Sequence, residues 1–189
     1  LGAKDLESAT ASDFFKIRTY AQAGFTNLRQ MFDGDVALVF LQSCVGDSLK
    51  PVKVATSQEF GPHSPHAASC SEVIALGFGN QESHAAALWG RGAASQLIST
   101  KEFVHFHDSC LDSALHATED RYAAFQFVAD NPLEVPADRE KFGEYFSGDR
   151  VLCFGGHSLR GTCHGDSGGP VLTFVQDQWV VIAVNSFVL

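Results

Sequence analysis

Positively charged residues are scarce in this chain: 13 Lys and Arg face 22 Asp and Glu over 189 residues, which gives a formal net charge of −9. Contacts to a phosphate backbone need clustered Lys and Arg, so nucleic-acid binding is disfavoured. No apolar run approaches the roughly 20 residues that cross a bilayer as a helix, so we expect no membrane span. The composition instead fits a folded globular protein with one large domain or two small ones.

Cysteine never occurs in a C-x-x-C pair here, which disfavours a zinc ribbon or a redox dithiol. The five cysteines are Cys44, Cys70, Cys110, Cys153 and Cys163. An odd count in a disulfide-type protein indicates a free thiol or a missing partner. The first residues, LGAKDLES, lack an initiator Met and the basic start and apolar stretch of a signal peptide. We therefore expect a processed or truncated chain.

Short apolar segments separated by turn residues follow one another along most of the chain. The expected strands are residues 16–20, 35–41, 73–76, 150–154, 171–175 and 179–186. Short strands at fairly even spacing predict an all-β barrel or sandwich. A stretch rich in Pro, Ser, Gly and His at 57–70 is typical of a linker between two units. Residues 111–149 carry much of the acid and predict a surface excursion, with a short helix at 137–146.

The segment that carries chemistry is CHGDSGGP, residues 163–170. A serine hydroxyl is a poor nucleophile unless a neighbouring base takes its proton, and it needs backbone N–H donors aimed at the developing oxyanion. Glycines around Ser167 permit a tight turn that side chains would forbid. Gly165 and Ser167 can then supply two N–H groups while the Ser167 hydroxyl points outward. The alternative is an ordinary glycine-rich turn between two strands.

The GDSGGP motif, followed by an apolar strand, resembles the nucleophile signature of the chymotrypsin/trypsin-like (S1) serine proteases. Other segments follow in the family's order. DVAL from Asp35 resembles the segment of the triad aspartate, residues 77–79 (GFG) resemble the opening of the second barrel, and residues 1–6 resemble the strand after the histidine segment. The resemblance covers nearly the whole chain apart from 111–149, and GDSGGP is its one highly specific motif.

The fold implied by this resemblance is all-β, with two antiparallel β-barrels of the chymotrypsin type. Residues 1–62 form a partial N-terminal barrel and the interbarrel linker. Residues 63–189 form the C-terminal barrel, with a long insertion at about 111–149. The chain ends at Leu189, before the family's last strand and C-terminal helix. We therefore expect the first barrel to be incomplete, the second to lack its C-terminal end, and a second chain or further segments to complete both.

The resemblance also assigns roles to residues. Ser167 is the nucleophile, and Asp35 orients the histidine and stabilises its imidazolium form. Gly165 and Ser167 form the oxyanion hole. Asp166 corresponds to the buried carboxylate that pairs with an ammonium group in active relatives, and it needs a cationic partner for that reason. The simpler alternatives are a capping or turn residue for Asp35 and a solvated turn acid for Asp166.

Four residues correspond to the substrate pocket of the family: Gly161, His164, Ser186 and Val188. Gly161 takes the place of the aspartate of trypsin-like enzymes, so a buried Lys or Arg would lack its counter-ion. Val188 takes the place of a glycine and would narrow the pocket. The resemblance thus implies an elastase-like preference for small apolar side chains. The alternative for Val188 is a core strand residue.

The family order is histidine, aspartate, serine, but all eight histidines of this chain follow Asp35. His164 stands three residues before Ser167, at a position that lies at the pocket rim in relatives, so we give it no catalytic role. The resemblance further implies a disulfide between Cys110 and Cys153, secretion from the cell, and neither a cofactor nor a metal. Cys163 would pair with a cysteine beyond the end of the chain, and the sequence does not pair Cys44 and Cys70.

Three functions follow from these residues. The first is a serine endopeptidase that cleaves polypeptides through an acyl-enzyme and is active only if the histidine-bearing segment is supplied. The second is an inactive homologue that serves as a binding or structural subunit, in line with the missing histidine and the departure at Val188. The third is a zinc hydrolase using His105, His107 and Asp108, although alternation on a strand explains that spacing equally well. We favour the first, because an idle site need not retain Asp35 and the whole motif.

Overall fold

The computed structural model describes residues 4–23, 34–47, 49–56, 58–60, 71–80, 94–104, 151–155 and 161–186. Within them the chain is all-β, apart from one turn of 3-10 helix, η1 (Ala11–Asp13). The strands are β1 (Ile17–Gln22), β2 (Ala37–Leu41), β3 (Lys53–Val54), β4 (Glu72–Gly77), β5 (Ile98–Val104), β6 (Phe154–Gly155), β7 (Pro170–Val175) and β8 (Gln178–Val184). The expected all-β class is therefore confirmed.

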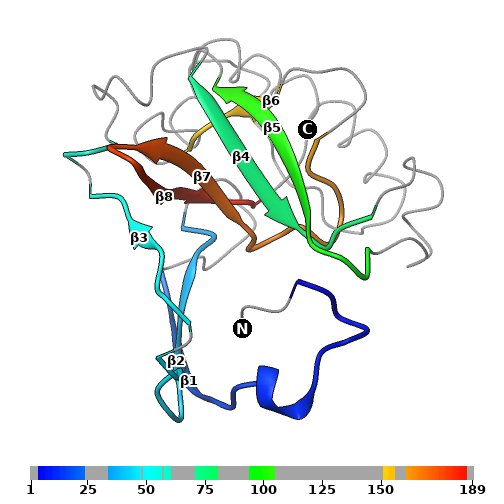
Figure 1. Ribbon diagram of the computed structural model, residues 1–189. Coiled ribbons are helices and arrows are strands. Elements are labelled where there is room, and N and C mark those ends of the chain that lie inside the picture. Colours follow the sequence, from blue (N-terminus) through cyan, green and yellow to red (C-terminus); the bar gives the residue numbers. More distant parts are fainter. Residues whose placement is uncertain are drawn as a thin grey trace, which may run out of the picture.

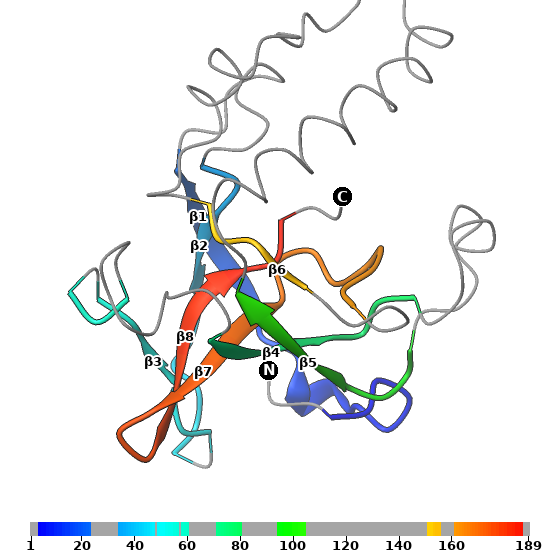
Figure 2. The same cartoon turned by 90° about the horizontal axis from the view of Figure 1, so that it is seen from above.

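Two sheets organise these strands. β1 and β2 form an antiparallel pair, and the other strands form a six-stranded sheet in the order β3-β8-β7-β4-β5-β6 (Figure 1). All neighbours in the larger sheet are antiparallel except β3 and β8. Figure 2 shows β4, β5, β7 and β8 from above as they cross the middle of the molecule. Neither sheet closes on itself, which is consistent with a partial two-barrel fold.

The expected strands overlap β1, β2, β4, β6, β7 and β8, whereas β3 and β5 were not expected. β5 was missed because its sequence, ISTKEFV, places Lys and Glu in the middle of a strand. The insertion at 111–149, the helix at 137–146 and the boundary between 62 and 63 lie outside the described residues. These expectations stay predictions.

A two-residue turn joins β7 and β8 into a hairpin. Gln176 and Asp177 both have positive φ, 48° and 60°, as a two-residue type I′ turn requires. This turn sets the register, which places Phe174 opposite Trp179, with ring centroids 5.1 Å apart in an edge contact. Val171 on the other face is fully buried. The hairpin thereby holds β7 in place at the point where the chain leaves the GDSGGP segment.

A small valine cluster forms the core of the larger sheet. Val73 of β4, Val104 of β5 and Val171 of β7 are each buried to 2% exposure or less. The partly buried residues packed against them are Leu152, Phe154, Ile182 and Ala183. Because β7 contributes to this cluster, burial of apolar area also stabilises the strand that follows the candidate nucleophile.

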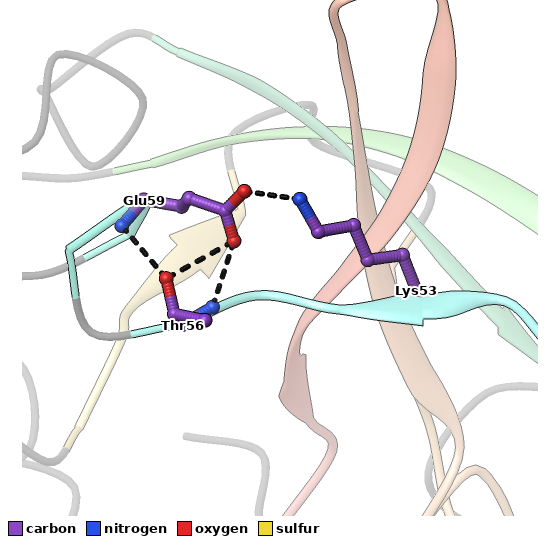
Figure 3. Close-up of polar contacts among 3 residues, drawn as sticks. All are labelled: Lys53, Thr56 and Glu59. Atoms are coloured by element: carbon purple, nitrogen blue, oxygen red, sulfur yellow. Dashed lines mark hydrogen bonds and ion pairs between the residues drawn. The ribbon is translucent and has the colours of Figure 1, made fainter.

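The turn after β3 is held by one carboxylate (Figure 3). Glu59 accepts hydrogen bonds from the Lys53 ammonium and, at 3.0 and 3.1 Å, from the N–H and hydroxyl of Thr56. The N–H of Glu59 donates back to the Thr56 hydroxyl at 3.3 Å, a reciprocal pattern like a helix capping box. The Lys53 ammonium, followed by the Thr56 N–H, lowers the pKa of Glu59 from 4.5 to about 2. Lys53 also pairs with Val180, so this turn is tied to β8.

The first described residues pair with the chain just before β5. Asp5 and Gln96 form an isolated antiparallel bridge. The N–H of Leu6 donates to the carbonyl of Ser95 at 2.7 Å, and a second bond joins Leu97 to the carbonyl of residue 4 at 2.8 Å. This contact links the N-terminal part of the chain to the larger sheet.

Candidate active site

The turn that carries Ser167 depends on two glycines with positive φ. Gly165 has φ of 97° and Gly168 has φ of 79°, in the region that side chains other than glycine rarely adopt. A Cβ on Gly165 would lie 3.2 Å from the Cα of Gly79. Within the turn, the N–H of Gly169 donates to the carbonyl of Asp166 at 2.9 Å. Ser167 lies between the two glycines and is exposed.

The side chain of Asp166 anchors the turn to the chain after β4. Its Oδ1 accepts the N–H of Gly79 at 2.7 Å, and its Oδ2 accepts the N–H of Cys163 at 2.8 Å. A Cβ on Gly77 would lie 1.8 Å from Oδ1, so the Asp166 carboxylate can occupy this position only because residue 77 is a glycine. In the described part of the chain these two amides, and no cation, contact the carboxylate. Such bonds to an ionised acceptor are stronger than bonds between neutral groups.

The backbone N–H groups on either side of Asp166 have no hydrogen-bond partner in the part of the chain that the structure describes. Among the described residues, neither the N–H of Gly165 nor that of Ser167 donates a hydrogen bond within the protein. Both residues are exposed, so water can satisfy the two donors in the free protein. Two unpaired donors beside an exposed serine are the arrangement that can stabilise an oxyanion.

The end of β8 holds the same turn from its other side. The N–H of Gly168 donates to the carbonyl of Asn185 at 2.7 Å, and the N–H of Asn185 donates to the carbonyl of Gly169 at 2.8 Å. Asn185 is 7% exposed, and the nitrogen and oxygen of its side chain have no hydrogen-bond partner among the described residues. The backbone of Asn185 therefore positions the turn, while its amide contributes no bond.

Asp35 reaches this region through Ser186. The Ser186 hydroxyl donates to Oδ2 of Asp35 at 2.6 Å. Asp35 is exposed and stands two residues before β2. Because Ser186 directly follows Asn185, which is bonded to the Ser167 turn, two consecutive residues join Asp35 to that turn. The structure thus brings the two residues expected to be catalytic to the same end of β8.

The residues expected in the substrate pocket differ in their exposure and in their contacts. Ser186 is half-buried beside Asp35, and Val188 lies outside the described residues. His164 is exposed, and its carbonyl accepts the N–H of Asn80 at 2.9 Å. Gly161 is exposed too, and the one atom of the described residues within 4 Å of a Cβ placed on it, beyond its chain neighbours, is Oε1 of Glu102 at 3.9 Å.

Glu102 is the residue near the site that the sequence did not reveal. It lies on β5 directly opposite Val73, and it is 1% exposed. Its Oε1 accepts the Thr100 hydroxyl at 2.8 Å, whereas Oε2 has no hydrogen-bond partner. Successive side chains of a strand alternate between the two faces, so Glu102 shares the face of buried Val104. In the sequence, this alternation was the only feature that could have indicated that Glu102 is buried.

The described cysteines differ in oxidation state. Cys153 is disulfide-bonded, while Cys44 and Cys163 are free thiols. The expected partner, Cys110, lies outside the described residues, so the pairing of Cys110 with Cys153 stays a prediction.

No histidine side chain can be assigned to the site from the described residues. His164 is the one histidine among them, and the other seven fall in the remaining segments. The proposed zinc ligands His105, His107 and Asp108 are in those segments as well. Within the described ranges there is no group of three or more His, Cys, Asp or Glu that could hold a metal ion. The same ranges contain no helix that is long and apolar enough to span a membrane.

Comparison with known proteins adds one match. The Trypsin family model matches residues 133–189, a segment that contains Gly161, the Ser167 turn and Ser186 but not Asp35. No curated protein matches the chain. The match covers the whole GDSGGP motif, and the motif lies on an all-β framework. The segment that holds the GDSGGP motif is therefore similar to the Trypsin family.

Proposed function

We propose that this protein is a serine endopeptidase in which Ser167 attacks a peptide carbonyl. The observation that carries the proposal is the exposed Ser167, whose own N–H and that of Gly165 have no partner among the described residues, in a turn joined through Asn185 and Ser186 to Asp35. Gly165 and Ser167 would stabilise the oxyanion as the acyl-enzyme forms. Asp35 would orient an imidazole that takes the Ser167 proton and returns it to the leaving amine.

In the family the catalytic histidine precedes the aspartate, and every histidine here follows Asp35, so we propose that the imidazole comes from outside residues 1–189. The exposed surface of the β1–β2 pair supports a covering segment of that kind. The apolar side chains exposed there are Ile17 (58%), Tyr20 (68%), Leu38 (66%), Val39 (53%) and Phe40 (41%). A two-stranded sheet is marginal alone and stabilised by packing. We propose that further polypeptide covers this sheet and supplies the imidazole near Asp35.

Secretion is part of the same proposal. Relatives with this domain are commonly secreted, and the disulfide at Cys153 fits an oxidising compartment. The small apolar preference expected from Gly161 and Val188 has one observation against it, because the buried carboxylate of Glu102 lies beside Gly161.

An active-site-directed fluorophosphonate tests the proposed function. We expect it to modify native protein at Ser167, as located by peptide mass mapping, and to leave a Ser167→Ala variant unmodified. Ser99→Ala, which changes an exposed serine on β5, is the matched control and should react like the native protein. Asp35→Asn should slow the reaction by about three orders of magnitude or more, because the imidazole loses its orienting carboxylate.

Failure of the folded native protein to react would overturn the proposal. That outcome would favour the inactive homologue, for which the specific observation is the lack of a histidine before Asp35.

A further inference from the structure

We infer that Asn80 is a positioning residue for the oxyanion: its backbone N–H fixes the peptide between His164 and Gly165, and thereby aims the Gly165 N–H. The inference rests on the proposed function for the role of that donor. It adds to the proposed site a backbone group from a different segment, since Asn80 lies three residues after the end of β4.

The peptide between His164 and Gly165 is held by its carbonyl. The carbonyl oxygen of His164 accepts the N–H of Asn80 at 2.9 Å. This peptide is trans, so its C=O and its N–H point in opposite directions. The bond to Asn80 therefore directs the N–H of Gly165 away from the chain after β4, where it meets no acceptor among the described residues.

This peptide has a second orientation, which the bond to Asn80 disfavours. Rotation of the peptide plane by about half a turn changes ψ of His164 and φ of Gly165 together, and it takes φ of Gly165 into the negative region open to all residues. In the structure φ of Gly165 is 97°. The rotated peptide would direct the carbonyl of His164 toward the oxyanion in place of an N–H. A carbonyl oxygen there would destabilise the developing negative charge.

The N–H of Asn80 is itself held in place by the other end of its own peptide. The carbonyl of Gly79, which belongs to that peptide, accepts the N–H of Ala94 at 3.3 Å. Ala94 is buried, and its N–H also donates to the carbonyl of Phe78 at 3.1 Å. Two trans peptides in series therefore connect the Ala94 N–H to the oxyanion donor. Hydrogen bonds in such a chain polarise one another, which strengthens the last donor.

The role belongs to the backbone of Asn80 and not to its side chain. Asn80→Ala retains the N–H, whereas Asn80→Pro removes the donor and places a ring carbon against the His164 carbonyl. A Cβ on Gly165 would lie 4.0 Å from the nitrogen of Asn80, so the backbones of the two segments already lie close together. The proline ring would therefore push the His164 carbonyl out of its present orientation.

A peptide aldehyde and the alcohol of the same sequence test the inference in the native enzyme. Both end in the residue after which the native enzyme cleaves a peptide library fastest. The aldehyde adds to a catalytic serine and creates an oxyanion, whereas the alcohol binds without one. We expect Asn80→Pro to bind the aldehyde about 100-fold more weakly and to lower kcat about 100-fold with KM unchanged. Its affinity for the alcohol should equal that of the native enzyme.

Two variants serve as controls. Asn80→Ala should match the native enzyme in kcat and in both affinities, because it keeps the N–H. Ser95→Pro places a proline in the segment before β5, where the N–H of Ser95 donates no hydrogen bond among the described residues. It should match the native enzyme as well, which would show that a proline near the site is not harmful in itself.

Native kcat and aldehyde affinity in Asn80→Pro would overturn the inference, as would an equal loss of alcohol affinity, which indicates general damage to the site. If Asn80→Pro does not fold, the α-hydroxy acid analogue of asparagine at residue 80 decides the matter. It replaces the N–H by an oxygen without adding a ring, and the same two outcomes would overturn the inference. Failure of the proposed function is distinct, because it appears as an absence of fluorophosphonate labelling at Ser167 in the native protein before any variant is made.

Discussion

The hydroxyl of Ser186 donates a 2.6 Å hydrogen bond to Oδ2 of Asp35, although 151 residues separate the two in the sequence. The bond joins a residue two positions before β2 to a residue two positions after β8, and so links the two sheets at the candidate site. Oδ2 of Asp35 is held in this way, and in the proposed mechanism Oδ1 would orient the imidazole. A pair of hydrogen bonds between Asn185 and the nucleophile turn lies one residue away.

Removing this hydroxyl should reduce activity more than stability. A hydrogen bond to a charged group contributes on the order of 1.5–3 kcal/mol. Because Asp35 is exposed, we expect the lower end of that range. Ser186→Ala should therefore lower kcat/KM of the native enzyme about 10-fold. Ser186→Thr retains a hydroxyl and should restore most of the loss, which a purely structural role would not predict. Ser99→Ala provides the control. Unchanged kinetics for Ser186→Ala would show that this bond does not position Asp35.

A methyl group at Gly77 should disrupt the anchor of Asp166. The added Cβ would lie 1.8 Å from Oδ1, so the carboxylate must leave the N–H groups of Gly79 and Cys163. We expect Gly77→Ala to lower the free energy of unfolding by about 2 kcal/mol or more, measured by urea denaturation. Gly161→Ala is the comparison for stability, because its Cβ meets its nearest neighbour at an ordinary 3.9 Å. Similar stability for both variants would contradict the anchoring role.

Replacement of the side-chain amide of Asn185 by an apolar group should increase the free energy of unfolding. Its nitrogen and oxygen are buried without partners, whereas its backbone bonds to Gly168 and Gly169 need no particular side chain. Asn185→Leu, of similar shape, should raise the free energy of unfolding by about 1 kcal/mol, because it ends the desolvation cost of an unpaired amide. Reaction of Ser167 with fluorophosphonate should be unchanged. A loss of stability would mean that the amide binds a group absent from the described structure.

The carboxyl group of Glu59 should titrate well below its ordinary range. Its pKa in the folded protein is lowered from 4.5 to about 2, so the stabilisation from its contacts is complete above pH 4.5 and is lost as the pH falls toward 2. Carbon-detected NMR titration should show this value in the native protein. Lys53→Met should move the pKa back toward 4.5, because the ammonium is the largest cause of the shift. Lys50→Met, which removes an exposed lysine nearby, should leave the pKa of Glu59 where it is.

Several elements could be predicted because their determinants are contiguous. β2, β4, β7 and β8 are short apolar runs bounded by turn residues, and the GDSGGP turn carries its own glycines for positive φ at Gly165 and Gly168. β5 could not be predicted in the same way, because Lys101 and Glu102 break the apolar pattern. Pairing with β4 and β6 on its two sides keeps β5 in the sheet despite those charges.

The sequence by itself determined the local chemistry: a serine in a glycine-rich turn ahead of a β-strand, with backbone donors at Gly165 and Ser167. Only the tertiary structure decided which distant groups serve that turn. Gly79 reaches Asp166 across 87 residues, Ser186 reaches Asp35 across 151, and the register of β5 against β4 places the charge of Glu102 beside Gly161. The physical reason is that φ preferences and alternation act between chain neighbours, whereas strand register and side-chain packing, which bring these groups within bonding distance, are properties of the assembled sheets.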